Sequence, residues 1–268
     1  MNTTKKKLMN NPPVIKYYDV ADEVVAFSTT RHGGFGKGAY SDFNINEYCG
    51  DDADTVIRNR EALCEELGID AKNIIMPHQT HGTEIRVIGP EFLELSSNSR
   101  RMVLEGVDAL MTSVRGVCIG VSTADCIPVL LYDIDSHAVC AVHAGWRGTV
   151  ARIVQKAVKE MHIVFGTNAA NLKAVIGPGI SLDSFEVGDE VFDSFSEAGF
   201  DMQKISCRKN KWHIDLPECN RIQMLESGVG ADNIYSCGIC TYENVADYFS
   251  ARRLGTESGR IFNAIYLR

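Results

Sequence analysis

Short runs of apolar, often branched residues recur along the chain and predict buried strands. Four such runs follow one another between residues 107 and 143, separated by brief segments that contain polar residues or glycine. Continuous apolar runs of this length are typical of strands that are covered on both faces. With shorter runs elsewhere, the expected strands are Ile74–Met76, Glu84–Ile88, Val107–Thr112, Val117–Ser122, Ile127–Asp133, Ala138–His143, Lys173–Ile176, Trp212–Ile214 and Ile261–Tyr266.

Other segments place apolar residues three or four positions apart, which predicts amphipathic helices. The helix over Asp54–Gly68 has signals at both ends, because Asp52 or Asp54 can cap its start and Gly68 can end it. A second helix follows the last of the four apolar runs, and its apolar residues form one stripe. The expected helices are Asp54–Gly68, Thr149–Phe165, Val187–Ala198 and Pro217 to Ser227.

Strands and helices are mixed along the chain rather than strictly alternating. This order favours an α/β fold, a single-domain sandwich with mixed β-sheets flanked by helices. The sequence contains neither an internal repeat nor a linker rich in Pro, Gly or Ser, so residues 14–268 are expected to form a single catalytic domain. Residues 1–13 include three lysines but lack the apolar stretch of a signal peptide, and they are expected to form a flexible N-terminal arm.

Composition and charge exclude several classes of protein. Of the 268 residues, 45% are hydrophobic and 23% are charged, which is ordinary for a folded chain and excludes a disordered one. Lys and Arg number 27 against 35 Asp and Glu, a formal net charge of −8, so binding of nucleic acid through bulk charge is not expected. No run approaches the ~18 apolar residues of a membrane span. Nine cysteines without an export signal indicate reduced thiols and a cytoplasmic location.

Polar residues that a core would not select gather in three segments at strand ends. These segments are His78–Gly82, Thr123–Cys126 and His143–Thr149. Imidazole and thiolate are ligands that zinc prefers, and three protein ligands with a free fourth position are typical of a catalytic site. One histidine of the first segment, Cys126 and His143 would supply that set. The third segment joins a strand to a helix through glycines, so its backbone N–H groups and Arg147 predict an anion site beside the metal.

A metal-free hydrolase is compatible with the same residues. Cys126 would then be the nucleophile and His143 the base that activates it. Either Asp125 or Gln79 could orient the base. This alternative predicts that the thiol reacts whether or not a metal is present.

Two further alternatives use other residues. A structural zinc module could be built from four cysteines, namely Cys207, Cys219, Cys237 and Cys240. Only the last two have the short spacing that such sites use, so the signal is weak. A non-enzymatic scaffold could present an aromatic patch, although aromatic residues at helical spacing are more typical of a core. The residues of that patch would be Tyr242, Tyr248 and Phe249.

Six motifs in one order make the sequence resemble a known family. They are HQTHGT (78–83), VDALMT (107–112), TADCIPVLLYD (123–133), HAGWRGT (143–149), IGPGI (176–180) and CTYENVADYFSARR (240–253). The sequence is similar to a bacterial family that is described both as multicopper polyphenol oxidase (laccase domain) and as purine nucleoside phosphorylase. The resemblance runs from about Phe27 to the C-terminus, which is almost the whole chain.

The resemblance implies one zinc ion bound through His81, Cys126 and His143. The first family ligand is the histidine before glycine in Q-x-H-G, which here is His81 and not His78. Members are described as using inorganic phosphate to cleave adenosine, inosine and methylthioadenosine, and as deaminating adenosine. The polyphenol oxidase name fits less well, because a chain with seven histidines cannot build several copper centres. A single copper in the same site is the form that this alternative takes.

Phosphorolysis also requires groups that bind a phosphate dianion and a nucleoside. Asp125 and Arg147 are the predicted catalytic residues, the first to orient or deprotonate an attacking water and the second to bind the anion. Arg31, Gln79 and Gly148 are predicted to bind substrate together with Arg147. The expected partners are a nucleoside and inorganic phosphate, with no nucleic acid and no membrane, and the expected state is a monomer or a small homo-oligomer.

Overall fold

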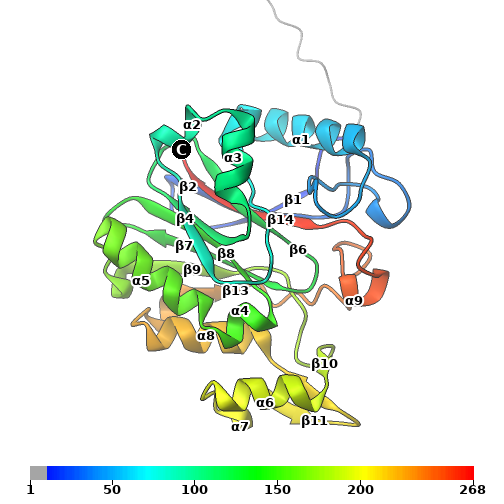
Figure 1. Cartoon of the computed structure of the whole chain (residues 1–268), viewed down its shortest axis with the longest axis vertical. Helices are drawn as coiled ribbons and strands as arrows, with labels where there is room; N and C mark the ends of the chain where they lie inside the picture. The colour runs from blue at the N-terminus through cyan, green and yellow to red at the C-terminus, as the bar shows by residue number, and fades with distance from the viewer. Residues whose placement is uncertain (1–10) are drawn as a thin grey trace, which may run out of the picture.

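The apolar runs form two β-sheets that pack face to face in the computed structural model, which describes residues 11–268 (Figure 1). Within those residues one sheet has five strands in the order β1-β2-β14-β6-β3. The other has six strands in the order β13-β9-β7-β8-β5-β4. Both sheets contain parallel and antiparallel pairs, so both are mixed as the sequence predicts.

The five-stranded sheet includes two strands beyond the predicted set. These are β1 and β2, which form an antiparallel pair near the start of the described chain. The last strand of the chain, β14, lies between β2 and β6. It therefore pairs with a strand from near the start of the described residues. The strands are β1 (Ile15–Tyr18), β2 (Val24–Thr29), β3 (Ile74–Ile75), β6 (Cys118–Thr123) and β14 (Ile261–Leu267).

The six-stranded sheet contains three of the four consecutive apolar runs. Their residues are buried throughout, which explains why the runs are continuous rather than alternating. The strands are β4 (Glu84–Val87), β5 (Val107–Thr112), β7 (Ile127–Asp133), β8 (Ala138–Ala144), β9 (Leu172–Ile176) and β13 (Ile234–Ser236).

Helices cover the outer faces of both sheets, which gives four layers and confirms the predicted sandwich (Figure 1). Helix α1 (Ala53–Leu67) buries Leu63 against the five-stranded sheet. Helices α5 (Ile153–Phe165) and α8 (Leu216–Glu226) pack on the six-stranded sheet. The predicted ends of α1 are confirmed, because Asp52 accepts a hydrogen bond from Thr55 N at 2.9 Å and Gly68 has φ +66°.

The helix predicted over Thr149–Phe165 is wrong at its start. The structure has a short helix α4 (Trp146–Val150), a break, and then α5. The break falls at Arg152, which has φ +62°, and its side chain donates to Ala198 O at 3.0 Å. The left-handed backbone at this residue interrupts the helix although the apolar spacing continues across it.

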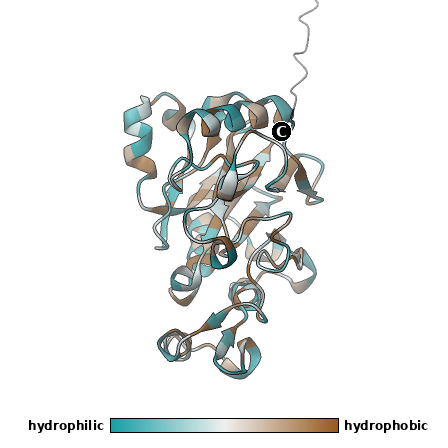
Figure 2. Ribbon diagram, turned by 90° about the vertical axis from the view of Figure 1, so that its right-hand side faces the viewer, coloured by the Kyte–Doolittle hydropathy of each residue, from teal (hydrophilic) through white to brown (hydrophobic). Residues whose placement is uncertain are grey.

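A small third sheet lies beyond the two large ones, at the lower end of the molecule in Figure 2. Here the predicted helix over Val187–Ala198 is corrected, because Val187 belongs to a strand and the helix begins after Gly188. The elements are β10 (Glu186–Val187), β11 (Ser206–Arg208), β12 (Trp212–Ile214), α6 (Asp189–Glu197) and α7 (Met202–Ile205).

The remaining helices are short. They are α2 (Pro90–Leu93), α3 (Ser97–Leu104) and α9 (Ala251–Leu254), with 3₁₀ turns at Gly38–Tyr40, Ala71–Asn73, Ala169–Asn171 and Ala231–Asn233. None of the helices formed by residues 11–268 has the length and apolar character needed to cross a membrane. The arm predicted over 1–13 falls mostly on residues 1–10, outside the described residues, and the single domain over 14–268 stays a prediction.

Candidate metal centre

Two loops and the end of strand β8 bring His81, Cys126 and His143 together at one end of the sandwich. One possible ligand atom from each residue lies within 4.8 Å of the other two. The imidazole centroids of His81 and His143 are 4.9 Å apart. His143 is buried, Cys126 is half-buried and His81 is exposed, so the cluster has one side open to solvent. A set of one thiolate and two imidazoles at this spacing is compatible with a bound metal ion.

The position of Cys126 follows from the connection between the two large sheets. Strand β6 of one sheet ends at Thr123, and strand β7 of the other begins at Ile127. The three residues between them therefore cross from sheet to sheet. Asp125 has φ +94°, a conformation that few residues other than glycine adopt, and this sharp turn places Cys126 at the end of the sandwich.

Asp108 holds the loop of His81 and the ring of His143 in place, and sequence analysis did not single it out. This carboxylate on β5 is fully buried, and its Oδ1 lies 2.7 Å from His143 Nδ1. It also accepts hydrogen bonds from the backbone N–H groups of His81 at 3.0 Å and Gly82 at 2.7 Å. Because Nδ1 of His143 faces Asp108, the other ring nitrogen is left for a metal, as in the carboxylate–histidine arrangement common beside zinc.

Charges within the cluster favour a thiolate. Burial by itself would raise the pKa of Cys126, but the charge and hydrogen bonds of His143, together with those of His81, lower it below its ordinary value. Against the effect of burial, Cys126 and Asp108 raise the pKa of His143. Thiolate is the form of cysteine that binds metals, so these charges prepare the cluster for an ion.

Gly145 leaves the space in which the three side chains meet. A Cβ atom at this residue would lie 2.9 Å from His81 Cδ2 and 3.1 Å from Cys126 Sγ. The first distance is shorter than real contacts of a Cβ atom, so any larger residue would push the histidine away. Glycine directly after the strand that carries His143 is therefore part of the fit between this chain and a metal.

We expect Gly145→Ala to weaken zinc binding by about 10–100-fold, the loss typical when groups that orient ligands are disturbed. The added methyl group would displace the exposed His81 ring, while the buried strand β8 would stay in place. Zinc affinity measured by competition with a chelator tests this. Gly230→Ala is the control, because a Cβ there meets only the side chain of Asn233, with Nδ2 at an ordinary 3.5 Å. Equal affinities in both variants would contradict the prediction.

A cavity of about 300 Å³ opens in front of the cluster and is lined by all three donors. Other lining residues come from distant parts of the chain, among them Asn46, Tyr48, Ser122, Thr256 and Arg260. The guanidinium of Arg260 donates to Gly259 O and Thr256 O, both at 2.9 Å. None of the ion pairs found in residues 11–268 involves Arg260. Sequence analysis missed this cation.

Two other predicted site residues have structural partners. Gln79 lines the cavity, and its amide exchanges hydrogen bonds with the backbone of Ser122 at 2.7 and 2.9 Å. Asp125 is not among the lining residues, because its carboxylate accepts from Thr241 Oγ1 and Arg252 N, each at 2.7 Å. Asp125 thus fixes the loops that frame the cavity.

The predicted anion-binding groups are not among the residues that line this cavity. Arg147 is exposed, and its guanidinium carbon lies 4.3 Å from the centre of the Trp146 ring. Gly148 is buried near the backbone oxygen of Gly82. Arg31 donates to Ser41 O at 2.9 Å and to Val245 O at 2.7 Å. None of the three lines the cavity, so their roles stay predictions without support from its geometry.

The competing cysteine module is not assembled. Among residues 11–268, His81, Cys126 and His143 are the one group of three or more side chains placed to hold a metal. The four cysteines considered for a structural zinc site are not brought together. Of the residues considered for an exposed aromatic patch, Tyr248 and Phe249 are buried, as is typical of core residues.

The fold and this cluster define a class: an α/β sandwich whose two sheets meet at a three-donor centre open to a cavity. The chain belongs to the family described as multi-copper polyphenol oxidoreductase laccase, whose pattern matches residues 25–268. The resemblance inferred from the sequence motifs is thereby confirmed.

Relatives in this family have names that refer to nucleosides. A protein of Bacteroides thetaiotaomicron named purine nucleoside phosphorylase is 45% identical over 268 residues, covering 99% of this chain and 98% of that protein. A protein from an unknown prokaryotic organism named adenosine deaminase RL5 is 44% identical over 246 residues, with 91% and 94% covered. YlmD of Geobacillus stearothermophilus has a solved structure with a TM-score of 0.87, 28% identity and coverage of 96% and 100%.

Proposed function

We propose that the chain is a zinc-dependent purine nucleoside phosphorylase that also deaminates adenosine. The observation that carries this proposal is the convergence of His81, Cys126 and His143 on the wall of a 300 Å³ cavity. The names of two relatives with more than 40% identity support the choice of substrate class. We further propose that the protein works in the cytoplasm.

Zinc suits the donor set better than the other common metals. One thiolate with two imidazoles and an open side is typical of catalytic zinc, and buried Asp108 supplies the usual partner for a ligating histidine. Zinc bound at such a site would act as a Lewis acid, which polarises a substrate oxygen and activates water. Copper would also bind these donors, as the family description suggests. The chain has seven histidines in total, too few for several copper centres.

The residues of the cavity would bind and position the reactants. The guanidinium of Arg260 is held by backbone oxygens rather than by a carboxylate, so it can attract a phosphate dianion. Asn46 and Thr256 offer polar groups to the sugar, and the ring of Tyr48 offers an aromatic surface to the purine. We therefore assign phosphate binding to Arg260 in preference to Arg147.

The experiment that tests the proposal measures release of free base from inosine and adenosine with and without inorganic phosphate. Phosphate-dependent formation of hypoxanthine or adenine, lost on removal of the metal and restored by zinc, is the expected result. Formation of inosine from adenosine without phosphate would establish the deaminase reaction separately. A zinc-loaded protein that produces none of these products would overturn the proposal.

We expect Arg260→Gln to raise the KM for phosphate by about tenfold or more, because a hydrogen bond to a charged group contributes roughly 1.5–3 kcal/mol. Deamination of adenosine uses no phosphate and should change much less. Steady-state kinetics with phosphate varied at fixed inosine checks this split. Arg253→Gln, in an exposed residue outside the cavity lining, is the matched control. An unchanged KM in Arg260→Gln would remove this residue from phosphate binding.

The geometry also gives one observation in favour of the metal-free hydrolase. Cys126, His143 and Asp108 form a chain of contacts that resembles a nucleophile, a base and an orienting acid. The third donor, His81, has no part in that mechanism, yet it places a possible ligand atom within 4.8 Å of those of Cys126 and His143. Metal binding explains all three residues, whereas nucleophilic catalysis explains two.

A further inference from the structure

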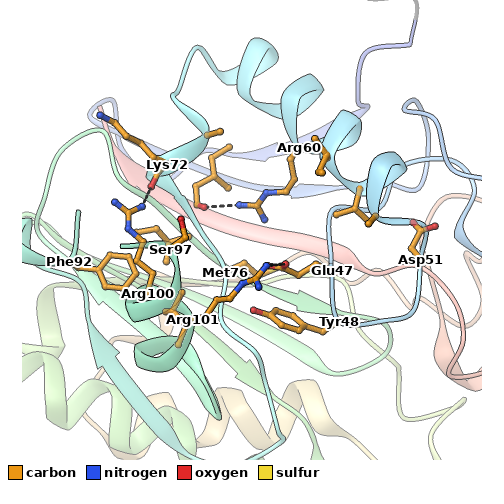
Figure 3. Close-up of a pocket in the computed structure, with 17 residues that line it drawn as sticks. Glu47, Tyr48, Asp51, Arg60, Lys72, Met76, Phe92, Ser97, Arg100 and Arg101 are labelled. Carbon is orange, nitrogen blue, oxygen red and sulfur yellow. Dashed lines mark hydrogen bonds and ion pairs between the residues drawn. The ribbon is translucent and has the colours of Figure 1, made fainter. Parts of the chain in front are cut away.

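A second cavity, of about 490 Å³, is lined by residues of α1, α3 and β3 (Figure 3). Most of its floor is apolar and buried. The floor is formed by Val56, Ile74, Ile75, Met76 and Leu104, and the buried ring of Phe92 lies at its edge. The ring of Tyr48 lines both this cavity and the one at the metal centre.

The charges at the edge of this cavity are mainly positive. Four of its lining residues are cationic and two are acidic, in a chain whose formal net charge is −8. Such a local excess of positive charge, against the balance of the whole protein, attracts anions. The cationic residues are Arg60, Lys72, Arg100 and Arg101, and the acidic ones are Glu47 and Asp51.

Two arginines reach the middle of the cavity from different helices. Figure 3 shows the guanidinium of Arg60, from α1, above that of Arg101, from α3, in the middle of the lining residues. Arg60 donates to Ile74 O at 3.0 Å and is half-buried, with no ion pair found among the described residues. Arg101 is exposed and lies 3.2 Å from Glu47. An anion between these two groups would gain charge-assisted hydrogen bonds from both.

Arg100 closes one end of the cavity in a fixed position. It donates to Lys72 O at 2.9 Å and to Leu95 O at 3.2 Å, and its guanidinium carbon lies 5.3 Å from the centre of the Phe92 ring. These bonds hold the helix α3 against the loop before β3. The cavity is thus a built structure with an apolar floor, rather than a gap between mobile side chains.

We propose that this second cavity binds a purine nucleoside monophosphate, with the phosphate between Arg60 and Arg101 and the base over the apolar floor. A flat, weakly polar ring fits a floor that offers few hydrogen-bonding groups, and the aromatic rings of Phe92 and Tyr48 stand at its edges. A nucleoside without phosphate would leave Arg60 without an anionic partner among the described residues. Inorganic phosphate would leave the floor open to water.

The position of Tyr48 places this ligand next to the reaction cavity. The Tyr48 ring stacks on the ring of His78, with centroids 4.3 Å apart, and His78 Nδ1 lies 2.8 Å from Glu105. His78 lies three residues before the candidate ligand His81 on the same loop. The two cavities share a wall, but the second contains none of the three donors, so binding there does not depend on the proposed reaction.

The test is to titrate AMP and IMP into the full, zinc-loaded protein and to measure the binding by isothermal titration calorimetry. Both nucleotides should bind, and Arg60→Gln should weaken binding by about tenfold or more, as loss of a charge-assisted bond predicts. Arg101→Gln, a change in an exposed residue, should weaken it in the same direction. Arg58→Gln is the matched control, because it removes the same charge from α1 at a residue that stacks on Phe35 and does not line the cavity.

Three outcomes decide the proposal. Loss of affinity in the Arg60 and Arg101 variants, with binding retained in Arg58→Gln and nucleoside turnover unchanged in all three, supports it. Affinity unchanged in Arg60→Gln and Arg101→Gln overturns it and places the nucleotide elsewhere, as at the reaction cavity. Binding weaker than about 1 mM for both nucleotides also overturns it. Turnover of inosine is measured on the same samples, so failure of this site and failure of the proposed enzyme activity are distinguished.

Discussion

Replacement of His81 by asparagine is expected to abolish stoichiometric zinc binding and to reduce nucleoside turnover by about 10²-fold or more, a loss typical of removing a group that stabilises charge in a transition state. His81 has φ +62°, and asparagine tolerates this left-handed backbone better than alanine does. The variant therefore removes the imidazole with little change in the loop. Metal content by elemental analysis and turnover of inosine are the two measurements.

The same variant separates the metal-dependent enzyme from the metal-free hydrolase. His81→Asn leaves the contacts among Cys126, His143 and Asp108 intact, so a hydrolase that uses this triad would keep its activity. A suitable control is His137→Asn, because His137 also has a positive φ, of +50°, and lies in the turn between β7 and β8, at the opposite end of this hairpin from Cys126 and His143. Full turnover in a zinc-free His81→Asn protein would overturn the metal assignment.

The second large effect is expected at Asp108. Asp108→Asn replaces a carboxylate that accepts from His143 and from three backbone N–H groups by an amide whose NH₂ group cannot accept. At least one buried donor is then left unpaired, at a cost of about 1–3 kcal/mol in the free energy of unfolding. Zinc affinity should fall by about 10–100-fold, because the imidazole of His143 is no longer oriented.

Asp133→Asn is the control for the structural part of that effect. Asp133 is also fully buried on a strand of the same sheet and accepts hydrogen bonds from Asp135 N at 3.0 Å and Ser136 Oγ at 2.6 Å. Its replacement should lower the stability without changing the zinc affinity. Denaturant unfolding and chelator competition, measured on both variants, check this. If the two variants lose zinc equally, Asp108 acts only through general stability.

The parts of the fold that sequence analysis predicts well are those with strong local patterns. The buried strands from 107 to 144 are continuous apolar runs, and α1 has recognisable caps at Asp52 and Gly68. The break before α5 is not predictable in this way. It depends on Arg152, whose side chain finds partners on Ala198 and Phe200, residues that only the tertiary fold brings near.

In the candidate site, too, residues with local sequence signals are predicted and residues placed by tertiary contacts are missed. The metal donors stand in motifs, so the family resemblance identifies them, and the structure brings them together. Asp108 lies inside one of those motifs, and its signal is a single acidic residue in an apolar strand, which sequence analysis passed over. Arg260 carries no local signal, because it reaches the cavity only when β14 pairs with β6. Arg31 and Arg147 stand in polar, glycine-rich segments, but the guanidinium of Arg31 bonds to Ser41 O, that of Arg147 lies over the neighbouring Trp146 ring, and neither lines the cavity.

The crossing of the chain from one large sheet to the other at Cys126 has a thermodynamic consequence. The three donors are close only while the two sheets are packed together, so an unfolded chain presents no ready-made chelate. Metal affinity and folding are then linked, and an ion at 100 times its dissociation constant adds about 2.7 kcal/mol to the unfolding free energy. A plot of melting temperature against free metal concentration would therefore report metal binding at this centre, and the measurement needs no substrate.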